Sequence, residues 1–508
     1  MSKSFLKSSG VFTAMTFISR VFGLIRDQII AILFGASALT DAFFVAFKIP
    51  NFFRRLFGEG AFSQAFIPIL AEAKASKDKN EVNLVINHIG TKFLKVLIIT
   101  TIIFVVASPI AIAIFAWGFY IDPDPTKYNA ASLMLKITFP YLLFIGLTAF
   151  AGSILNSYDR FAAPAFTPVI LNISIIIFAY FSSEWFSEPI IALAWGVFFG
   201  GLLQLIFQIP FLLKLGKVPR IVKGTHTSEK ILKKRMIPAL FGVSVSQINL
   251  LVDTIVASFL VSGSVTWLYY SDRLMELPLA LIGIAIATVA LSKLSNYFAQ
   301  KDYKNFIKTI DSAIKYFLIF GIPSSIGLIL LAEEMIITLF QYHEFTPNAA
   351  LQSSKSLIAY GAGLIFFILV KIFATIFLSR GDTKTPVKVG VVAMLSNIIL
   401  NVILAYYFSH VGIAIATSLS AFLNSYLLYF YLRKESIEVF SQSNKILFLK
   451  VIFSVVVMGI TVLLTISPID YFYSGTIFER VSNLLLTISL AVIVYFLALK
   501  SLRVRLTS

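Results

Sequence analysis

Fourteen long apolar runs constrain this chain more than any other feature of its sequence. They cover roughly residues 8–34, 38–70, 90–118, 131–156, 160–183, 187–214, 236–261, 264–298, 311–340, 350–379, 385–408, 411–433, 447–467 and 480–500. A helix needs about 20 mostly apolar residues to cross a bilayer, and each run is long enough. The runs do not alternate polar and apolar residues, as strands of a membrane barrel would. The sequence therefore predicts an all-α polytopic membrane protein with 14 transmembrane helices.

The composition excludes several other classes of protein. Charged residues make up only 13% of the chain, whereas a soluble domain has about 25%. There is no cysteine, so disulfides and thiolate metal sites are excluded. The chain has no GxxxxGK[ST] phosphate loop, and its four histidines fall near predicted loops without a converging catalytic set. We therefore expect no enzymatic activity.

The net charge of +17 is distributed in a way that indicates topology. Lys and Arg concentrate in the segment 214–235, in the connection after the second run, around 293–308 and in the C-terminal tail. The alternate connections lean acidic. Because basic loops stay in the cytoplasm, this alternation fits fourteen spans with both termini cytoplasmic. The basic residues then set topology and attract anionic membrane lipids, and we expect no nucleic-acid partner.

The chain also contains a weak internal repeat. Residues 154–164 (ILNSYDRFAAP) resemble 376–386 (IFLSRGDTKTP), and further matches follow in the same order at offsets of 222 to 226 residues. This offset holds six runs, an even number, so the two halves have the same orientation in the membrane. We predict two six-helix lobes in a pseudo-twofold parallel repeat, with two additional C-terminal helices. The expected divisions are an N-lobe (1–214), a basic cytoplasmic linker (215–235), a C-lobe (236–434), and the last two helices with a tail (445–508).

Charged residues inside the runs mark a candidate site. A charge at the bilayer centre costs at least about 2.5–3.5 kcal/mol, so such residues are functional candidates. In the first two runs basic residues exceed acidic ones, and most of the basic residues are arginines. The charged residues there are Arg20, Arg26, Asp27, Asp41, Lys48, Arg54, Arg55 and Glu59. The eighth run adds Asp272, Arg273 and Glu276. The guanidinium fork matches phosphate, so these residues favour an anionic substrate over a proton or cation. The alternative is local pairing and anchoring at helix ends.

Helix-breaking residues accompany these charges in the second run. Pro50, Gly58 and Gly60 flank the two arginines there. Backbone groups freed by such breaks are tolerated only against protein or water. We therefore expect a bent second helix that lines a cavity.

A second polar cluster lies in the later runs. Asp253 interrupts an apolar segment, Asn397 and Asn401 share one helix face, and Thr417 lies in the next run. Their oxygens could hold Na+, or the amides and hydroxyl could simply join helices by hydrogen bonds. The sequence leaves both interpretations open.

Several of these motifs together resemble the MurJ (MviN) family of lipid II flippases, within the MOP exporter superfamily. The strongest segments are SRVFGLIRD (19–27), the long run from TDAFF to ILAE (40–72) and YYSDRLMELP (269–278). The resemblance implies two six-helix lobes with two C-terminal helices. It also implies transport of lipid II, the undecaprenyl-pyrophosphate-linked peptidoglycan precursor, from the inner to the outer leaflet of the cytoplasmic membrane by alternating access.

The resemblance further implies roles for individual residues. The positions that match the family's substrate-binding motifs are Ser19, Arg20, Arg26, Asp41, Arg54, Arg273 and Glu276. The positions that match its sodium site are Asp253, Asn397, Asn401, Ile413 through its carbonyl, and Thr417. Asn401 departs from the family pattern, which has Asp there, and so weakens the expected cation site. An ion gradient or the membrane potential would supply the drive, and cell-wall synthesis proteins are the expected protein partners.

Two alternatives stay open from the sequence. A related MOP-type exporter could carry another lipid-linked oligosaccharide or a drug, although an excess of arginine disfavours cationic drugs. A membrane scaffold of the wall-synthesis machinery is the other alternative, although a scaffold needs no charge inside the membrane.

Overall fold

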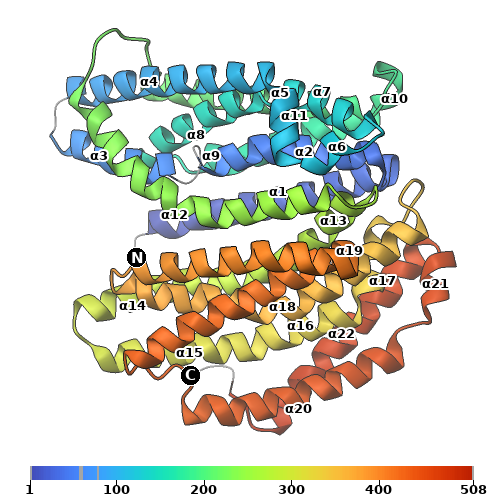
Figure 1. The fold of residues 1–508 in the computed structure, drawn as a ribbon. Coiled ribbons are helices and arrows are strands. Elements are labelled where there is room, and N and C mark those ends of the chain that lie inside the picture. The colour runs from blue at the N-terminus through green and yellow to red at the C-terminus, as the bar shows by residue number, and fades with distance from the viewer. Residues whose placement is uncertain (1–2, 57–60, 77–78, 506–508) are drawn as a thin grey trace. The chain divides into compact units, whose positions relative to one another are not determined.

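The computed structural model describes residues 3–56, 61–76 and 79–505, and within these ranges the regular structure is helical, with no strand. Its contacts divide the chain into two compact units, Met1–Gly263 and Ser264–Ser508. Figure 1 shows the helices of each unit along the colour gradient from blue to red. The predicted all-α fold is confirmed.

The first unit contains twelve helices within the described residues. They are α1 (Lys3–Phe34), α2 (Ala38–Phe53), α3 (Ala61–Ala75), α4 (Lys79–Val106), α5 (Ser108–Phe115), α6 (Trp117–Ile121), α7 (Thr126–Thr138), α8 (Tyr141–Ser157), α9 (Ala162–Tyr180), α10 (Ser182–Trp185), α11 (Ile191–Leu215) and α12 (Thr227–Ala257). The most extensive contacts join α9 to α11, α1 to α9, and α2 to α7. The intramembrane charges of α1 and α2 therefore lie on helices that are packed within this unit.

The second unit begins at Ser264 and includes two short π-helical segments. Its elements are α13 (Ser264–Pro278), η2 (Leu279–Ile284), α14 (Ala285–Ala299), α15 (Tyr303–Tyr316), η3 (Phe317–Gly321), α16 (Ile322–Leu330), α17 (Ala332–Phe340), α18 (Pro347–Ser379), α19 (Lys384–Lys434), α20 (Gln442–Thr465), α21 (Ile469–Ser474) and α22 (Ile477–Ser501). The most extensive contact here is between α18 and α19, and α20 pairs with α22.

Ten helical segments among the described residues are long and apolar enough to cross a membrane. They overlap eleven of the fourteen predicted runs, because the 51-residue α19 covers both the runs 385–408 and 411–433. The other three runs, 8–34, 38–70 and 236–261, coincide with charged or interrupted helices, namely α1, α2 with α3, and α12. The chain is thus a multi-span membrane protein, and the count of fourteen stays a prediction.

Local sequence explains where several helices begin and end. Ser37 caps α2, since its side chain accepts a hydrogen bond from the Thr40 N–H. Gly216 ends α11 in the left-handed conformation (φ 62°), which glycine adopts at little cost. Ser409 (φ 54°, ψ −137°) divides α19 into two helical halves. The predicted bend in the second run corresponds to the end of α2 at Phe53, while Gly58 and Gly60 lie outside the described residues.

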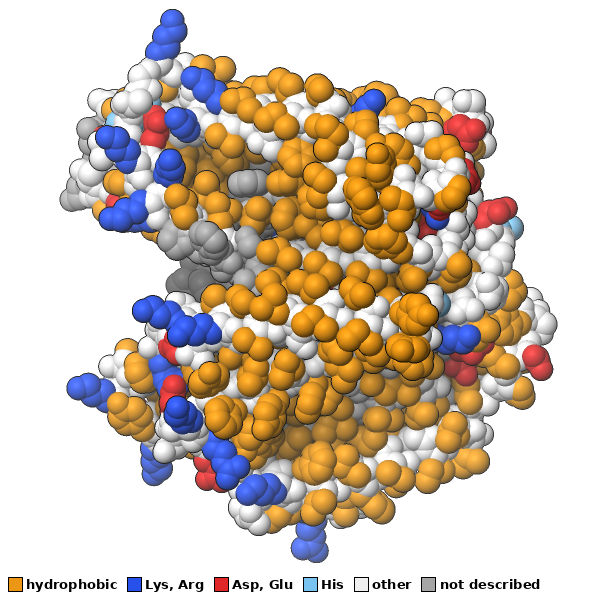
Figure 2. Space-filling model, viewed as in Figure 1, with side chains coloured by type: hydrophobic (Ala, Val, Ile, Leu, Met, Phe, Trp, Pro, Cys, Tyr) orange, Lys and Arg blue, Asp and Glu red, His pale blue; other side chains and the backbone are white. Residues whose placement is uncertain are grey.

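Charge and apolar surface are separated within each unit. Figure 2 shows Lys and Arg side chains gathered at one end of each unit, with hydrophobic side chains covering the helices beyond them. This pattern is expected when the middle of the helices faces lipid and the basic ends face the cytoplasm.

One contact within each unit follows the internal repeat. In the first unit the Arg220 N–H donates to Asn87 Oδ1 (2.8 Å), which joins the segment after α11 to α4. In the second, Asn444 Nδ2 donates to Asp311 Oδ1 (2.8 Å), which joins the start of α20 to α15. Asn444 follows Arg220 by 224 residues, and Asp311 follows Asn87 by the same number. This spacing lies within the offset range of the internal repeat.

The boundary between the two compact units, after Gly263, falls later in the chain than the predicted start of the C-lobe at residue 236. The helix α12 belongs to the first unit because it packs on α3 and α4. The predicted linker 215–235 is an extended segment followed by the first turns of α12. The two units are defined by which residues contact one another, whereas the lobes were predicted from the internal sequence repeat. The lobe boundaries therefore stay a prediction.

Candidate functional site

Arg26 on α1 lies in a buried polar network. Its side chain and that of Asp27 are almost fully enclosed, with residue exposures of 5% and 3%. Arg26 Nε and Nη2 donate to Asp27 Oδ1 at 3.0 and 2.6 Å, and Nη1 donates to Asn172 Oδ1 at 3.0 Å. The guanidinium is therefore held by a neighbouring carboxylate and by an amide from α9.

Asn172 extends this network to a second position on α1. Its Nδ2 donates to the main-chain carbonyl of Ser19 at 3.2 Å. The amide therefore fixes α1 at two places about two turns apart, and α1 and α9 make one of the larger helix contacts of the unit. The sequence alone assigned no separate role to this residue. The missed signal is a buried amide in an otherwise apolar helix, which needs polar partners.

Arg20, in contrast, is exposed on α1, and Ser19 is half-buried beside it. The two predicted arginines of α1 thus differ in accessibility. Arg20 lies on the surface of its unit, whereas the enclosed Arg26 is engaged with protein groups.

The charges of α2 connect this helix to the C-terminal part of the first unit. Asp41 is 1% exposed, and its Oδ2 accepts a hydrogen bond from the Gly263 N–H at 2.7 Å. Lys48 Nζ donates to Thr254 Oγ1 on α12 at 3.3 Å. Asp41 therefore positions the chain after α12, a role distinct from the ligand contact that the resemblance implies.

Arg54 lies at the C-terminal end of α2 and is half-exposed. Its Nε donates to Asn51 Oδ1 at 3.1 Å, and Asn51 Nδ2 in turn donates to the Phe47 carbonyl at 3.0 Å. These hydrogen bonds hold the guanidinium through its Nε atom, and the residue as a whole is partly exposed. Arg54 is thus suited to bind an anion.

Arg273 and Glu276 form a pair on α13 in the second unit. Arg273 Nη1 lies 3.4 Å from Glu276 Oε2, and the two side chains are 37% and 43% exposed. Arg273 Nε and Nη2 each donate to the Tyr269 hydroxyl at 3.2 Å, and the guanidinium lies 5.2 Å from the Tyr269 ring centroid. The aromatic ring and carboxylate orient the guanidinium without enclosing it.

Four of the five residues predicted for a sodium site lie together on α19. Asn401 Nδ2 donates to Asn397 Oδ1 (3.1 Å), Asn397 Nδ2 to Thr417 Oγ1 (3.3 Å), and Thr417 Oγ1 to the Ile413 carbonyl (3.0 Å). Both asparagines are fully buried. Amide, hydroxyl and carbonyl oxygens are hard ligands of the kind an alkali cation prefers, so the donor set fits Na+. The fifth residue, Asp253, lies on α12 in the first unit.

Lys371 is a charged residue that the sequence reasoning missed. It lies within the apolar helix α18 and is exposed on the surface of its unit. The signal was available, because any charge inside a membrane-spanning helix is costly. Lys371 stands apart from the clustered charges of the first two runs and the eighth, so it forms no motif in the sequence.

Comparisons with known proteins agree on one family. The family model described as "Lipid II flippase MurJ" matches residues 30–482. A curated relative from Haemophilus influenzae, named "Probable lipid II flippase MurJ", is 46% identical over 504 residues, covering 97% of this chain and 98% of its own.

Solved structures give the same result for the fold. A structure titled "Lipid II flippase MurJ, inward closed conformation" is similar with a TM-score of 0.83 and 31% identity, covering 97% of this chain and 99% of the other. An inward-facing multidrug-resistance MATE transporter of the MOP superfamily matches with a TM-score of 0.70 and 13% identity, over 85% of this chain and 98% of the other. The second likeness concerns the fold alone.

Proposed function

The chain belongs to the lipid II flippase MurJ family, and we propose that it carries lipid II across the bacterial inner membrane by alternating access. The observation that supports this function most strongly is the 46% identity to a relative named as a lipid II flippase, over nearly the full length of both chains. The chain is accordingly a transporter and not an enzyme. Its substrate is a membrane lipid that carries a pyrophosphate, which agrees with the anionic substrate that the arginines predict.

We assign the contacts with the pyrophosphate to the arginines that are not fully enclosed. These are Arg20 and Arg54 on the first unit and Arg273 on the second. Each can donate two parallel hydrogen bonds to phosphate oxygens. Glu276 and Tyr269 hold Arg273 in a defined orientation, so less side-chain entropy is lost when the ligand binds.

Arg26 and Asp41 receive a different role in this proposal. Both are enclosed and hydrogen-bonded to protein groups, Arg26 to Asp27 and Asn172, and Asp41 to Gly263. They position the helices that carry Arg20 and Arg54. Loss of either then impairs transport by displacing α1 or α2, without removing a direct contact to lipid II.

The drive is proposed to be an ion gradient or the membrane potential. Na+ coupling is supported by the oxygen cluster of Asn397, Thr417 and the Ile413 carbonyl in the second unit. Asn401 in place of a carboxylate would weaken this site, and the charged ligand that the resemblance implies, Asp253, belongs to the first unit. The basic ends of the helices favour cytoplasmic termini, and proteins of cell-wall synthesis are the proposed partners of the transporter.

Complementation of a strain depleted of its own flippase tests this function. The variants Arg20→Ala, Arg54→Ala and Arg273→Ala should insert normally, as detected by membrane fractionation, yet fail to support growth. Arg503→Ala, at an exposed position in the C-terminal tail, is the matched control and should complement. Normal growth of a strain that carries all three changes together would refute the assignment.

The alternative function, export of another lipid-linked oligosaccharide, is distinguished from lipid II transport by the substrate that the protein moves faster. Liposomes that contain the protein should translocate lipid II faster than an undecaprenyl-linked sugar that lacks the peptide. Equal or faster movement of the second lipid would favour the alternative.

A further inference from the structure

A short extended segment runs along the basic end of α4 in the first unit. This segment, residues 216–226, is called the strap here, and it connects α11 to α12. Lys217 Nζ donates to Asn83 Oδ1 (2.7 Å), the Arg220 N–H to Asn87 Oδ1 (2.8 Å), and the Val222 N–H to Thr91 Oγ1 (3.1 Å). The three α4 residues are spaced four apart, so they line one helix face. The strap is thus held in place by a row of specific contacts.

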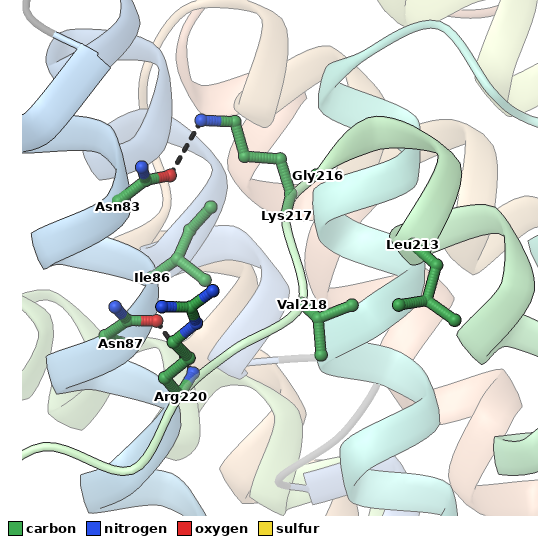
Figure 3. Close-up of a pocket in the computed structure, with 8 residues that line it drawn as sticks. All are labelled: Asn83, Ile86, Asn87, Leu213, Gly216, Lys217, Val218 and Arg220. Atoms are coloured by element: carbon green, nitrogen blue, oxygen red, sulfur yellow. Dashed lines mark hydrogen bonds between the residues drawn. The ribbon is translucent and has the colours of Figure 1, made fainter.

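A cavity of about 290 Å³ lies where the strap leaves α11. Figure 3 shows Asn83 and Asn87 of α4 on one side, Leu213 at the end of α11 on the other, and Lys217 and Arg220 of the strap between them. Ile86 adds an apolar side chain on the α4 wall. The cavity therefore presents two cations and two amides beside an apolar surface.

Among the described residues, two glutamates near the strap pair with histidines. Glu81 Oε1 lies 3.6 Å from His226 Nε2, and Glu229 Oε1 lies 3.3 Å from His88 Nδ1. Neither glutamate lines the cavity, whose ionisable side chains are both basic. The cavity consequently attracts anions.

The position of the cavity identifies the kind of anion. Leu213 is 63% exposed and lies in the last turn of the apolar helix α11, where the lipid-facing surface ends. A group bound here lies at the depth of the lipid headgroups on the basic side of the membrane. An amphiphile would place its phosphate between Lys217 and Arg220, and its hydrocarbon would follow the exposed side of α11.

We propose that this cavity is a binding site for the phosphate headgroup of an anionic glycerophospholipid from the cytoplasmic leaflet. Lys217 and the guanidinium of Arg220 bind the phosphodiester oxygens, the two asparagine amides are available to the glycerol hydroxyls, and Leu213 contacts the first part of an acyl chain. The bound lipid bridges α11, the strap and α4. This site is independent of the lipid II assignment, because none of its residues is among the proposed transport residues.

Native mass spectrometry of the full-length protein in detergent tests the site with three probes. These are dioctanoyl phosphatidylglycerol, dioctanoyl phosphatidylcholine and inorganic phosphate. The protein should bind the anionic lipid most tightly. The pair Lys217→Ala with Arg220→Ala should weaken this binding about 30-fold, since each basic residue near an anionic lipid surface contributes about fivefold.

Two further variants keep the test specific. Lys230→Ala with Lys233→Ala removes two charges from α12 outside the cavity and should leave the affinity unchanged. Arg220→Gln alone retains the main-chain bond to Asn87, and should weaken lipid binding without lowering the thermal unfolding temperature. Equal loss in both double variants, or equal binding of phosphatidylcholine, would overturn the proposal. Binding of inorganic phosphate as tight as that of the anionic lipid would show a free-phosphate site and would also overturn it.

Discussion

Asn172 offers the sharpest test of how the buried network on α1 works. Replacing it with leucine removes the hydrogen bond from Arg26 Nη1 (3.0 Å) and the one to the Ser19 carbonyl (3.2 Å). A hydrogen bond to a charged group contributes about 1.5–3 kcal/mol. A neutral interhelical bond in a membrane protein contributes about 0.6 kcal/mol. We therefore expect Asn172→Leu to lower the free energy of unfolding by about 2–4 kcal/mol.

Reversible unfolding in sodium dodecyl sulfate, followed by circular dichroism, measures this difference. Ser174→Ala is the matched control, because Ser174 lies on the same helix and its hydroxyl donates only to the neutral Gly196 carbonyl (2.8 Å). Its expected cost is about 0.6 kcal/mol. If Asn172→Leu costs no more than Ser174→Ala, the amide does not hold the guanidinium and the reasoning fails.

A second substitution separates stability from transport. Asn172→Asp keeps an acceptor for Arg26 Nη1 and strengthens it with a charge, but it cannot donate to the Ser19 carbonyl, so it should recover only the part of the stability that depends on Arg26. It also makes the Arg26–Asp27 network net negative, which should reduce the affinity for lipid II in a liposome binding assay. If the Asn172→Asp protein is stable and binds lipid II normally, the charge of this network does not affect the substrate.

The remaining predictions concern three other positions. Asp41→Ala should cost about 1–3 kcal/mol in the same unfolding assay, because the Gly263 N–H loses its carboxylate acceptor, and Asp41→Asn should cost less. Asn401→Asp should raise the affinity for Na+, measured by isothermal titration, and an unchanged affinity would remove this residue from the proposed site. The side-chain and main-chain hydrogen bonds from Asn305 lower the pKa of Asp302 at the start of α15. This contribution to stability is present above the unfolded-state pKa of about 3.9 and is lost as the pH falls through the lower folded-state value. The protection factor of amides at the α15 N-terminus, which corrects for the intrinsic exchange rate, should therefore fall below about pH 4, and Asp302→Asn should abolish this fall.

Much of the fold followed from the apolar runs, and the reason is physical. A bilayer forces every spanning segment to satisfy its own backbone hydrogen bonds, so a long apolar run can only be a helix. Breaks inside a predicted run were less visible in the sequence. The division between α7 and α8 falls near Pro140, inside the predicted run 131–156. The division within α19 at Ser409, in contrast, falls in the gap between the predicted runs 385–408 and 411–433.

The candidate site was only partly predictable. Charge inside the runs identified Arg26, Asp41 and Arg273, because burying a charge is costly wherever it occurs. The partner of Arg26 lies 146 residues away on α9, and that of Asp41 lies 222 residues away. Such pairings depend on how helices pack, which the sequence of one chain does not specify. For the same reason, the sequence grouped accessible and enclosed arginines together, whereas the structure separates them.

The most direct test of the central claim is the rate of lipid II translocation in liposomes that contain the purified protein. A fluorescent lipid II placed in one leaflet should reach the other leaflet faster with the wild-type protein than in empty liposomes. The Arg20→Ala, Arg54→Ala, Arg273→Ala triple variant, reconstituted to the same density, should fall to the rate of empty liposomes. A triple variant that moves lipid II at the wild-type rate would contradict the assignment of these arginines, and a wild-type protein no faster than empty liposomes would contradict the function itself.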